Sequence, residues 1–184
     1  MSERAVMDHL AVSRAIRRMA SEISEQLPDT EDLALVGIHT GGVPLCERLA
    51  RAIERQEGVR PPVGEMDITL YRDDIYTGLE RPELGPTRLP FDVSGATIVL
   101  VDDVLFTGRT VRAALDQLWD FGRPKAIWLA VLVDRGHREL PIAAQYVGRT
   151  VDTRMDDRVL VSVADDGPVP QDRVVVISGQ EAAR

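Results

Sequence analysis

The chain has 184 residues, of which 44% are apolar, 28% charged and 4% aromatic. This length and composition predict one compact domain over residues 1–184 with a sizeable core, and they exclude a disordered chain. The net charge of −8 disfavours general binding to nucleic acids or anionic membranes but is compatible with a local basic patch. A single cysteine forms no internal disulfide, and no apolar stretch approaches the roughly 20 residues that span a bilayer. We therefore expect a soluble, cytoplasmic protein without a membrane partner.

Helices and buried strands alternate in the first half of the predicted structure. Apolar residues at helical spacing predict an amphipathic helix from about residue 5 to 26, and a continuous apolar run predicts a buried strand over 33–38. A helix with Pro44 in its first turn follows, and then a half-buried strand over 65–70. Residues 72–90 show little periodicity, and a loop of that length is usually functional.

The second half continues the alternation and predicts the fold class. Four further apolar runs predict strands over 97–101, 126–133, 158–163 and 173–178. A helix between the first two of these ends at Gly122, and the last two read as a terminal antiparallel hairpin. The pattern predicts an α/β fold with a mainly parallel, twisted sheet and helices on both of its faces.

The most informative polar residues follow the strand at 97–101. Ligands of open α/β sheets bind outside the carboxyl ends of the strands, and here Asp102 and Asp103 precede the turn at 107–110, where the next helix begins. A glycine turn at a helix N-terminus offers backbone N–H groups to a phosphate. Because carboxylates repel a phosphate, the two acids favour a part of the ligand that donates hydrogen bonds or binds through a cation, and a ribose diol fits that need. The alternative is a polar turn followed by an ordinary helix cap.

The segment Val99–Thr110, VLVDDVLFTGRT, resembles the phosphoribosyl-pyrophosphate (PRPP) signature of type I phosphoribosyltransferases. Three more blocks, LALVGIHTGGVPL, DITLYRDD and VLVDRGHRELPIAAQYVG, resemble one branch of that family, the regulators of pyrimidine genes that are also uracil phosphoribosyltransferases. The resemblance implies the type I phosphoribosyltransferase fold, with a flexible hood loop at about 71–90. It also implies the transfer of phosphoribose from PRPP to uracil, giving UMP and pyrophosphate.

The resemblance also implies roles for particular residues. Asp102 and Asp103 would orient the ribose, and to these we add Arg72 as our own candidate for stabilising the departing pyrophosphate. The other expected ligand contacts are Leu105, Phe106, Thr107, Gly108, Arg109 and Thr110 for the 5′-phosphate, Thr40, Gly41 and Gly42 for pyrophosphate, and Val133, Asp134 and Arg135 for the base. Mg²⁺ would be the cofactor, held through pyrophosphate and ribose oxygens with no certain protein ligand.

One departure from the family pattern lies in the expected pyrophosphate loop. Relatives usually carry arginine where this chain has Gly41, and loss of that charge-assisted contact to the leaving group would reduce turnover. Arg72 is a candidate replacement. Two alternatives stay open: a phosphoribosyltransferase for another base such as hypoxanthine, and a nucleotide-sensing regulator with weak catalysis.

The same branch of the family binds a leader-mRNA hairpin of pyrimidine genes when UMP is bound, through a basic face of a homodimer or higher homo-oligomer. The residues that would form this face are His137, Arg138, Arg149, Arg17 and Thr153. Arginines clustered on one face bind phosphates even when the total charge of the chain is acidic, and this binding weakens as the salt concentration rises. The alternative is an ordinary solvated surface, where most arginines lie.

Overall fold

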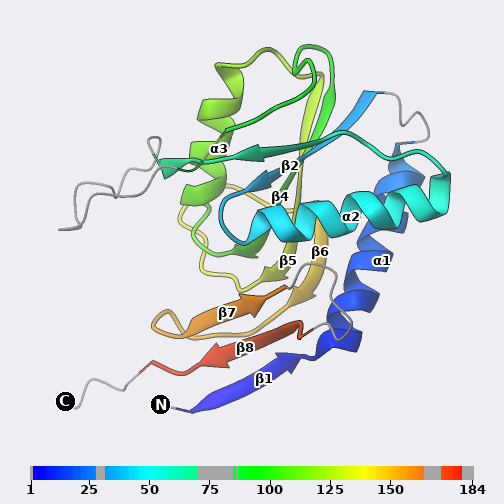
Figure 1. Ribbon diagram of the computed structural model, residues 1–184. Helices are drawn as coiled ribbons and strands as arrows, with labels where there is room; N and C mark the ends of the chain where they lie inside the picture. The colour runs from blue at the N-terminus through cyan, green and yellow to red at the C-terminus, as the bar shows by residue number, and fades with distance from the viewer. Residues whose placement is uncertain (1, 28–31, 70–84, 86, 164–170, 180–184) are drawn as a thin grey trace.

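The computed structural model describes residues 2–27, 32–69, 85, 87–163 and 171–179, arranged in two sheets (Figure 1). A five-stranded parallel sheet has the order β3-β2-β4-β5-β6, and a three-stranded antiparallel sheet has the order β1-β8-β7. The elements are β1 (Glu3–Met7), α1 (His9–Gln26), β2 (Leu33–Ile38), α2 (Gly42–Glu57), β3 (Val63–Met66), β4 (Thr97–Leu105), α3 (Arg109–Trp119), β5 (Ala126–Asp134), β6 (Tyr146–Thr150), β7 (Arg158–Ser162) and β8 (Arg173–Ile177).

Helices cover both faces of the parallel sheet. Val99 of β4 packs in one apolar cluster with side chains of α1 and α2, including Ile16 and Leu49. The next residue, Leu100, belongs to a second cluster with Val111 and other side chains of α3. Because successive side chains of a strand point to opposite faces, α3 lies on the face opposite α1 and α2. The predicted mainly parallel sheet between helices is confirmed.

The N-terminal helix begins later than the sequence pattern predicts. Residues 3–7 form β1, which pairs antiparallel with β8. The helix starts at His9, where the Asp8 side chain caps it by accepting a hydrogen bond from the backbone N–H of Ala11 at 2.8 Å. The expected helix start at residue 5 is therefore wrong, because pairing with a strand from the far end of the chain outweighs local helical spacing.

The predicted C-terminal hairpin is present but is part of a larger unit. Strands β7 and β8 pair antiparallel, with Leu160 opposite Val175, and β1 pairs with the other edge of β8. Val174 and Val176 of β8 join the apolar cluster of α1 and α2, so one face of this small sheet is buried against the main body. In the described part of the chain, no helix is both long and apolar enough to cross a bilayer.

Strand β3 is shorter and earlier than the predicted strand at 65–70. It covers Val63–Met66, and the carboxylate of the next residue, Asp67, accepts hydrogen bonds from the backbone N–H groups of Thr69, at 2.8 Å, and of Gly85. Most of the expected hood loop at 71–90, including Arg72, lies outside the described residues.

Candidate functional site

The two acids of the signature lie inside a strand. Strand β4 continues through Asp102 and Asp103 to Leu105, because β5 extends alongside it and places Val131 opposite Asp102. Asp102 is only 6% exposed, and its Oδ1 accepts a hydrogen bond from the backbone N–H of Asp103 at 3.0 Å. The parallel sheet thus presents a rigid, adjacent pair of carboxyl groups near the carboxyl end of its central strand.

Burial raises the pKa of both carboxyl groups. For Asp102 the largest cause is loss of hydration, and the negative charge of Asp103 adds to it. Loss of hydration is also the main cause of the raised pKa of Asp103. Two buried like charges side by side are unfavourable without hydrogen-bond donors or a cation to compensate them. The pair is therefore suited to a ligand that supplies hydroxyl groups or a metal ion.

The phosphate turn, by which we mean residues 105–110, borders the same cavity as Asp102. Gly108 has the left-handed φ of 93° and is the N-cap residue of α3, which begins at Arg109 without a side-chain cap. The cavity has a volume of about 300 Å³. Its lining residues are Asp102, Val104, Leu105, Phe106, Thr107, Gly108, Arg109, Thr110, Val111 and Glu139. The structure thus joins a carboxyl group of the pair to a helix N-terminus that favours anions.

The glycine loop after β2 packs against the end of β4. An ideal Cβ on Gly41 would lie 2.1 Å from Oδ2 of Asp103, and one on Gly42 would lie 2.2 Å from the carbonyl oxygen of Val101. At Gly42 the near atoms are main chain, so the position requires glycine, whereas at Gly41 they belong to the Asp103 side chain. The predicted pyrophosphate loop, Thr40 to Gly42, therefore lies directly beside the acidic pair.

The end of β5 and the residues directly after it are buried or partly buried. Val133 is fully buried, and the carboxylate of Asp134 accepts a hydrogen bond from the backbone N–H of Gly136 at 2.9 Å. Asp134 also forms an ion pair with Arg138. Of the three predicted base contacts, only Asp134 has a partly exposed side chain, and it is the last residue of β5.

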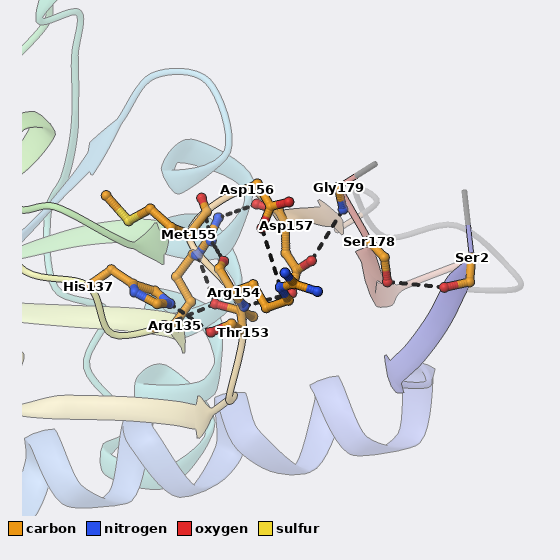
Figure 2. A network of polar contacts seen from close by, with 10 residues as sticks. All are labelled: Ser2, Arg135, His137, Thr153, Arg154, Met155, Asp156, Asp157, Ser178 and Gly179. Atoms are coloured by element: carbon orange, nitrogen blue, oxygen red, sulfur yellow. Dashed lines mark hydrogen bonds and ion pairs between the residues drawn. The ribbon is translucent and has the colours of Figure 1, made fainter. Parts of the chain in front are cut away.

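The third predicted base contact, Arg135, is part of a polar network that Figure 2 shows from close by. Its guanidinium donates to the carbonyl oxygens of Asp157 at 2.8 Å and Arg154 at 2.7 Å, and to the Thr153 hydroxyl at 3.2 Å. It also lies 4.0 Å above the centre of the Phe106 ring. The Arg135 side chain therefore connects the phosphate turn to the segment between β6 and β7, and its charge is directed inward.

The residues predicted to bind RNA lie along α1, β6 and the segments that flank β6. Arg18, the neighbour of Arg17, donates to two carbonyl oxygens of β6 at 2.7 and 2.9 Å, which holds α1 against that edge strand. Arg149 on β6 donates to a carbonyl oxygen of β1 at 2.9 Å. A ring nitrogen of His137 lies 2.8 Å from the carbonyl oxygen of Thr153. These contacts join α1 to β6, β6 to β1, and His137 to Thr153, while Arg17 and Arg149 stay exposed.

Three residues that line the cavity, Val104, Val111 and Glu139, were not predicted as site residues from the sequence, and Glu139 is the charged one. Glu139 lines the cavity, and its carboxylate lies 2.7 Å from Nε of Arg109 in the phosphate turn. The two residues belong to separate segments of the chain, so no local pattern signals their contact. Among the described residues, no group of three or more His, Cys, Asp or Glu side chains forms a metal site of its own.

Comparison with known proteins identifies the family. The model of the phosphoribosyl transferase domain matches residues 3–165. The chain belongs to the phosphoribosyltransferase family. Within this family it is 56% identical over 170 residues to the bifunctional protein PyrR of Thermus aquaticus, covering 92% of each chain. It is also 52% identical over 178 residues to the bifunctional protein PyrR of Chloroflexus aurantiacus, covering 97% of each. It is therefore a phosphoribosyltransferase of the PyrR type.

Solved structures of phosphoribosyltransferases share the fold. The hypoxanthine phosphoribosyltransferase of Trypanosoma cruzi superposes with a TM-score of 0.71 over 96% of this chain and 97% of its own, at 16% identity. A hypoxanthine-guanine phosphoribosyltransferase of Bacillus anthracis gives 0.69 over 96% of this chain and all of its own, at 15% identity. The predicted type I phosphoribosyltransferase fold is thus confirmed. At this level of identity the likeness concerns the fold and not the base.

Proposed function

We propose that this phosphoribosyltransferase transfers phosphoribose from PRPP to uracil and releases UMP and pyrophosphate. The observation that carries the proposal is the cavity that borders both Asp102 and the phosphate turn. A ribose 5-phosphate needs an anion site and hydrogen-bond acceptors for its diol, and this cavity combines the two. The choice of uracil is supported by the resemblance of residues 131–148 to the pyrimidine branch of the family and by the PyrR relatives.

The chain's own residues position the reactants. The N-terminus of α3 and the hydroxyls of Thr107 and Thr110 bind the 5′-phosphate, and Asp102 and Asp103 accept hydrogen bonds from the ribose hydroxyls. These donors offset the burial that raises the pKa of both acids, so the bound sugar favours their ionised form. Displacement of pyrophosphate by a ring nitrogen of the base builds positive charge on the ribose, which the two carboxylates stabilise. This reaction needs no covalent nucleophile on the protein.

The donor set fits Mg²⁺ as cofactor. Carboxylate oxygens are the protein ligands that Mg²⁺ prefers, and this ion usually keeps several waters and binds substrate phosphates. Asp102 and Asp103 supply such oxygens beside the glycine loop at Gly41. When bound, Mg²⁺ neutralises charge on the leaving pyrophosphate. Backbone N–H groups of the glycine loop also donate hydrogen bonds to the leaving pyrophosphate, and we propose that Arg72 stabilises its charge.

Initial rates of nucleotide formation from PRPP and a panel of bases test this function. We expect UMP from uracil at saturating Mg²⁺, and little product from hypoxanthine, guanine or adenine. IMP formation in the absence of UMP formation would contradict the choice of base and favour the first alternative. Binding of UMP without turnover of any base would instead favour a nucleotide-sensing regulator with weak catalysis. This second alternative is suggested by Gly41, which stands where relatives usually carry an arginine that contacts the leaving group.

We further propose that the protein is a homodimer or higher homo-oligomer that binds a leader-mRNA hairpin of pyrimidine genes when UMP is bound. Arg18 holds α1 against β6, and the exposed side chains of Arg17 on α1 and Arg149 on β6 support the proposal of a basic surface there. A mobility shift of the hairpin with and without UMP, repeated at rising salt, tests the proposal. We expect binding with UMP that weakens steeply with salt. Arg149→Gln should weaken RNA binding. Arg60→Gln is the matched control, because Arg60 is an exposed arginine that pairs with Glu47.

A further inference from the structure

The segment at 135–140 holds three consecutive carbonyl oxygens of the phosphate turn. The carbonyl of Leu105 accepts from the backbone N–H of Arg135 at 3.1 Å. The carbonyl of Thr107 accepts from the N–H groups of Glu139 at 3.0 Å and of the residue after it at 3.2 Å. Between them, the carbonyl of Phe106 is bound by a side chain, not by backbone. Carbonyl oxygens repel a phosphate, so holding all three in hydrogen bonds favours an anion site in the turn.

The side chain that binds Phe106 is Arg138. Its Nη1 donates to the Phe106 carbonyl at 2.8 Å and to the Gly136 carbonyl at 3.0 Å, and its Nε donates to the Ile142 carbonyl at 3.1 Å. Its Nη2 pairs with the carboxylate of Asp134. Each nitrogen of the guanidinium therefore has a partner inside the chain. The ring of the same Phe106 lies under the guanidinium of Arg135, so the residue is fixed on both its main chain and its side chain.

We propose that Arg138 is a positioning residue that keeps the phosphate turn in the conformation that binds PRPP, a proposal that rests on the function proposed above. Its side chain is 22% exposed, and an RNA phosphate would have to displace these internal partners to reach it. Arg138 thus differs from Arg149, which is exposed and lies on another strand.

The geometry requires arginine and not just a positive charge. The planar guanidinium donates in several fixed directions at once, whereas the ammonium group of lysine is a compact point charge on a flexible stem. Lysine at this position would pair with Asp134 but would not reach the carbonyls of Phe106, Gly136 and Ile142 together. A surface arginine that binds RNA phosphates by charge tolerates lysine much better.

The test measures PRPP binding by the full chain with Mg²⁺ and no base, using titration calorimetry, for the wild type, Arg138→Gln and Arg138→Lys. Losing a well-placed hydrogen bond to a charged ligand weakens binding by about 10- to 100-fold, so we expect the PRPP dissociation constant to rise by that factor in both variants. Arg112→Gln is the matched control, because Arg112 is an exposed arginine on α3 that pairs with Asp116. It should bind PRPP like the wild type.

Steady-state kinetics separate positioning from a general loss of structure. We expect the KM for PRPP to rise with the dissociation constant, while the KM for uracil and kcat at saturating PRPP stay within about threefold of the wild type. Thermal unfolding of each variant reports its fold. If Arg138→Gln does not fold, Asp134→Asn replaces it, since it removes the ionic partner of the guanidinium and should raise the PRPP dissociation constant in the same direction.

The outcomes distinguish this inference from the proposed function. Unchanged PRPP affinity in Arg138→Gln, or full recovery in Arg138→Lys, would overturn the positioning role. Wild-type binding of PRPP without use of uracil would overturn the proposed base, while the comparison of Arg138 variants would still decide the inference. A wild-type chain that does not bind PRPP would overturn both.

Discussion

The approach of Gly41 to Asp103 allows a direct test of how closely the site is built. A Cβ at Gly41 would lie 2.1 Å from Oδ2 of Asp103 and 2.3 Å from its Cγ, whereas Cβ contacts below 3.0 Å are essentially never seen in proteins. Gly41→Ala therefore requires the carboxylate or the loop to move by about 1 Å. Because a shift of that size in a positioning group costs on the order of 100-fold, we expect kcat/KM for PRPP to fall about 10- to 100-fold.

The assay is the initial rate of UMP formation over a range of PRPP concentrations at saturating Mg²⁺. Asp103→Ala removes the two closest atoms, so Gly41→Ala should cost much less in that background than in the wild type. Gly41→Arg meets the same atoms, and we expect it to lower activity even though relatives usually carry arginine there. Wild-type kcat/KM in Gly41→Ala would refute the reasoning, and a gain in Gly41→Arg would show that charge on the leaving group outweighs the contact.

Three further predictions concern the acids of β4 and the buried arginine. Asp103→Asn should weaken PRPP binding about tenfold or more with little change in Tm, because it removes a charged acceptor of the ribose hydroxyls. Titration calorimetry measures the PRPP dissociation constant, and an unchanged value would contradict the ribose assignment. Burial raises the pKa of Asp102 above its value in the unfolded chain, so the folded state holds the proton longer and stability falls as pH rises through that window. Asp102→Asn removes the free-energy cost of ionising this buried carboxyl group, so it should raise Tm of the ligand-free chain near pH 7, by roughly 2–4 °C for each kcal/mol removed. The variant should also show a flatter dependence of Tm on pH. An unchanged profile would argue against burial of Asp102 as the cause of that dependence. Arg135→Met should lower the free energy of unfolding by about 2–4 kcal/mol, since it leaves the Asp157 carbonyl, whose hydrogen bond is buried, and the part-buried Arg154 carbonyl without their donor. Urea unfolding measures this change, and a loss below about 1 kcal/mol would contradict the role of the network.

The sequence predicts the central sheet well because strands covered on both faces have a simple signature. The apolar run at 33–38 corresponds to the whole of β2, and the run at 126–133 to all but the last residue of β5. The acidic pair and the glycine turn also stand together in the sequence, so the cavity that Asp102 shares with the turn follows from the strand–turn–helix order. Helical spacing likewise predicts α3 and the burial of its Val111 and Leu118.

Other features depend on contacts between distant segments and leave no local trace. Strand β1 forms only because β8 pairs with it, and the helical spacing around residue 5 hides it. Arg135 resembles a ligand contact in the sequence, yet its partners come from the segment before β7. Trp119, the last residue of α3, follows the buried Leu118 but is 53% exposed. The roles of Arg72 and of the hood loop stay predictions.

A crystal structure of the chain with UMP and Mg²⁺ examines the ribose-phosphate site itself. The account predicts the 5′-phosphate within hydrogen-bonding distance of backbone N–H groups between Thr107 and Thr110, and the ribose hydroxyls on the carboxylates of Asp102 and Asp103. A nucleotide bound elsewhere, or a phosphate in the turn with its sugar directed away from both acids, would contradict it.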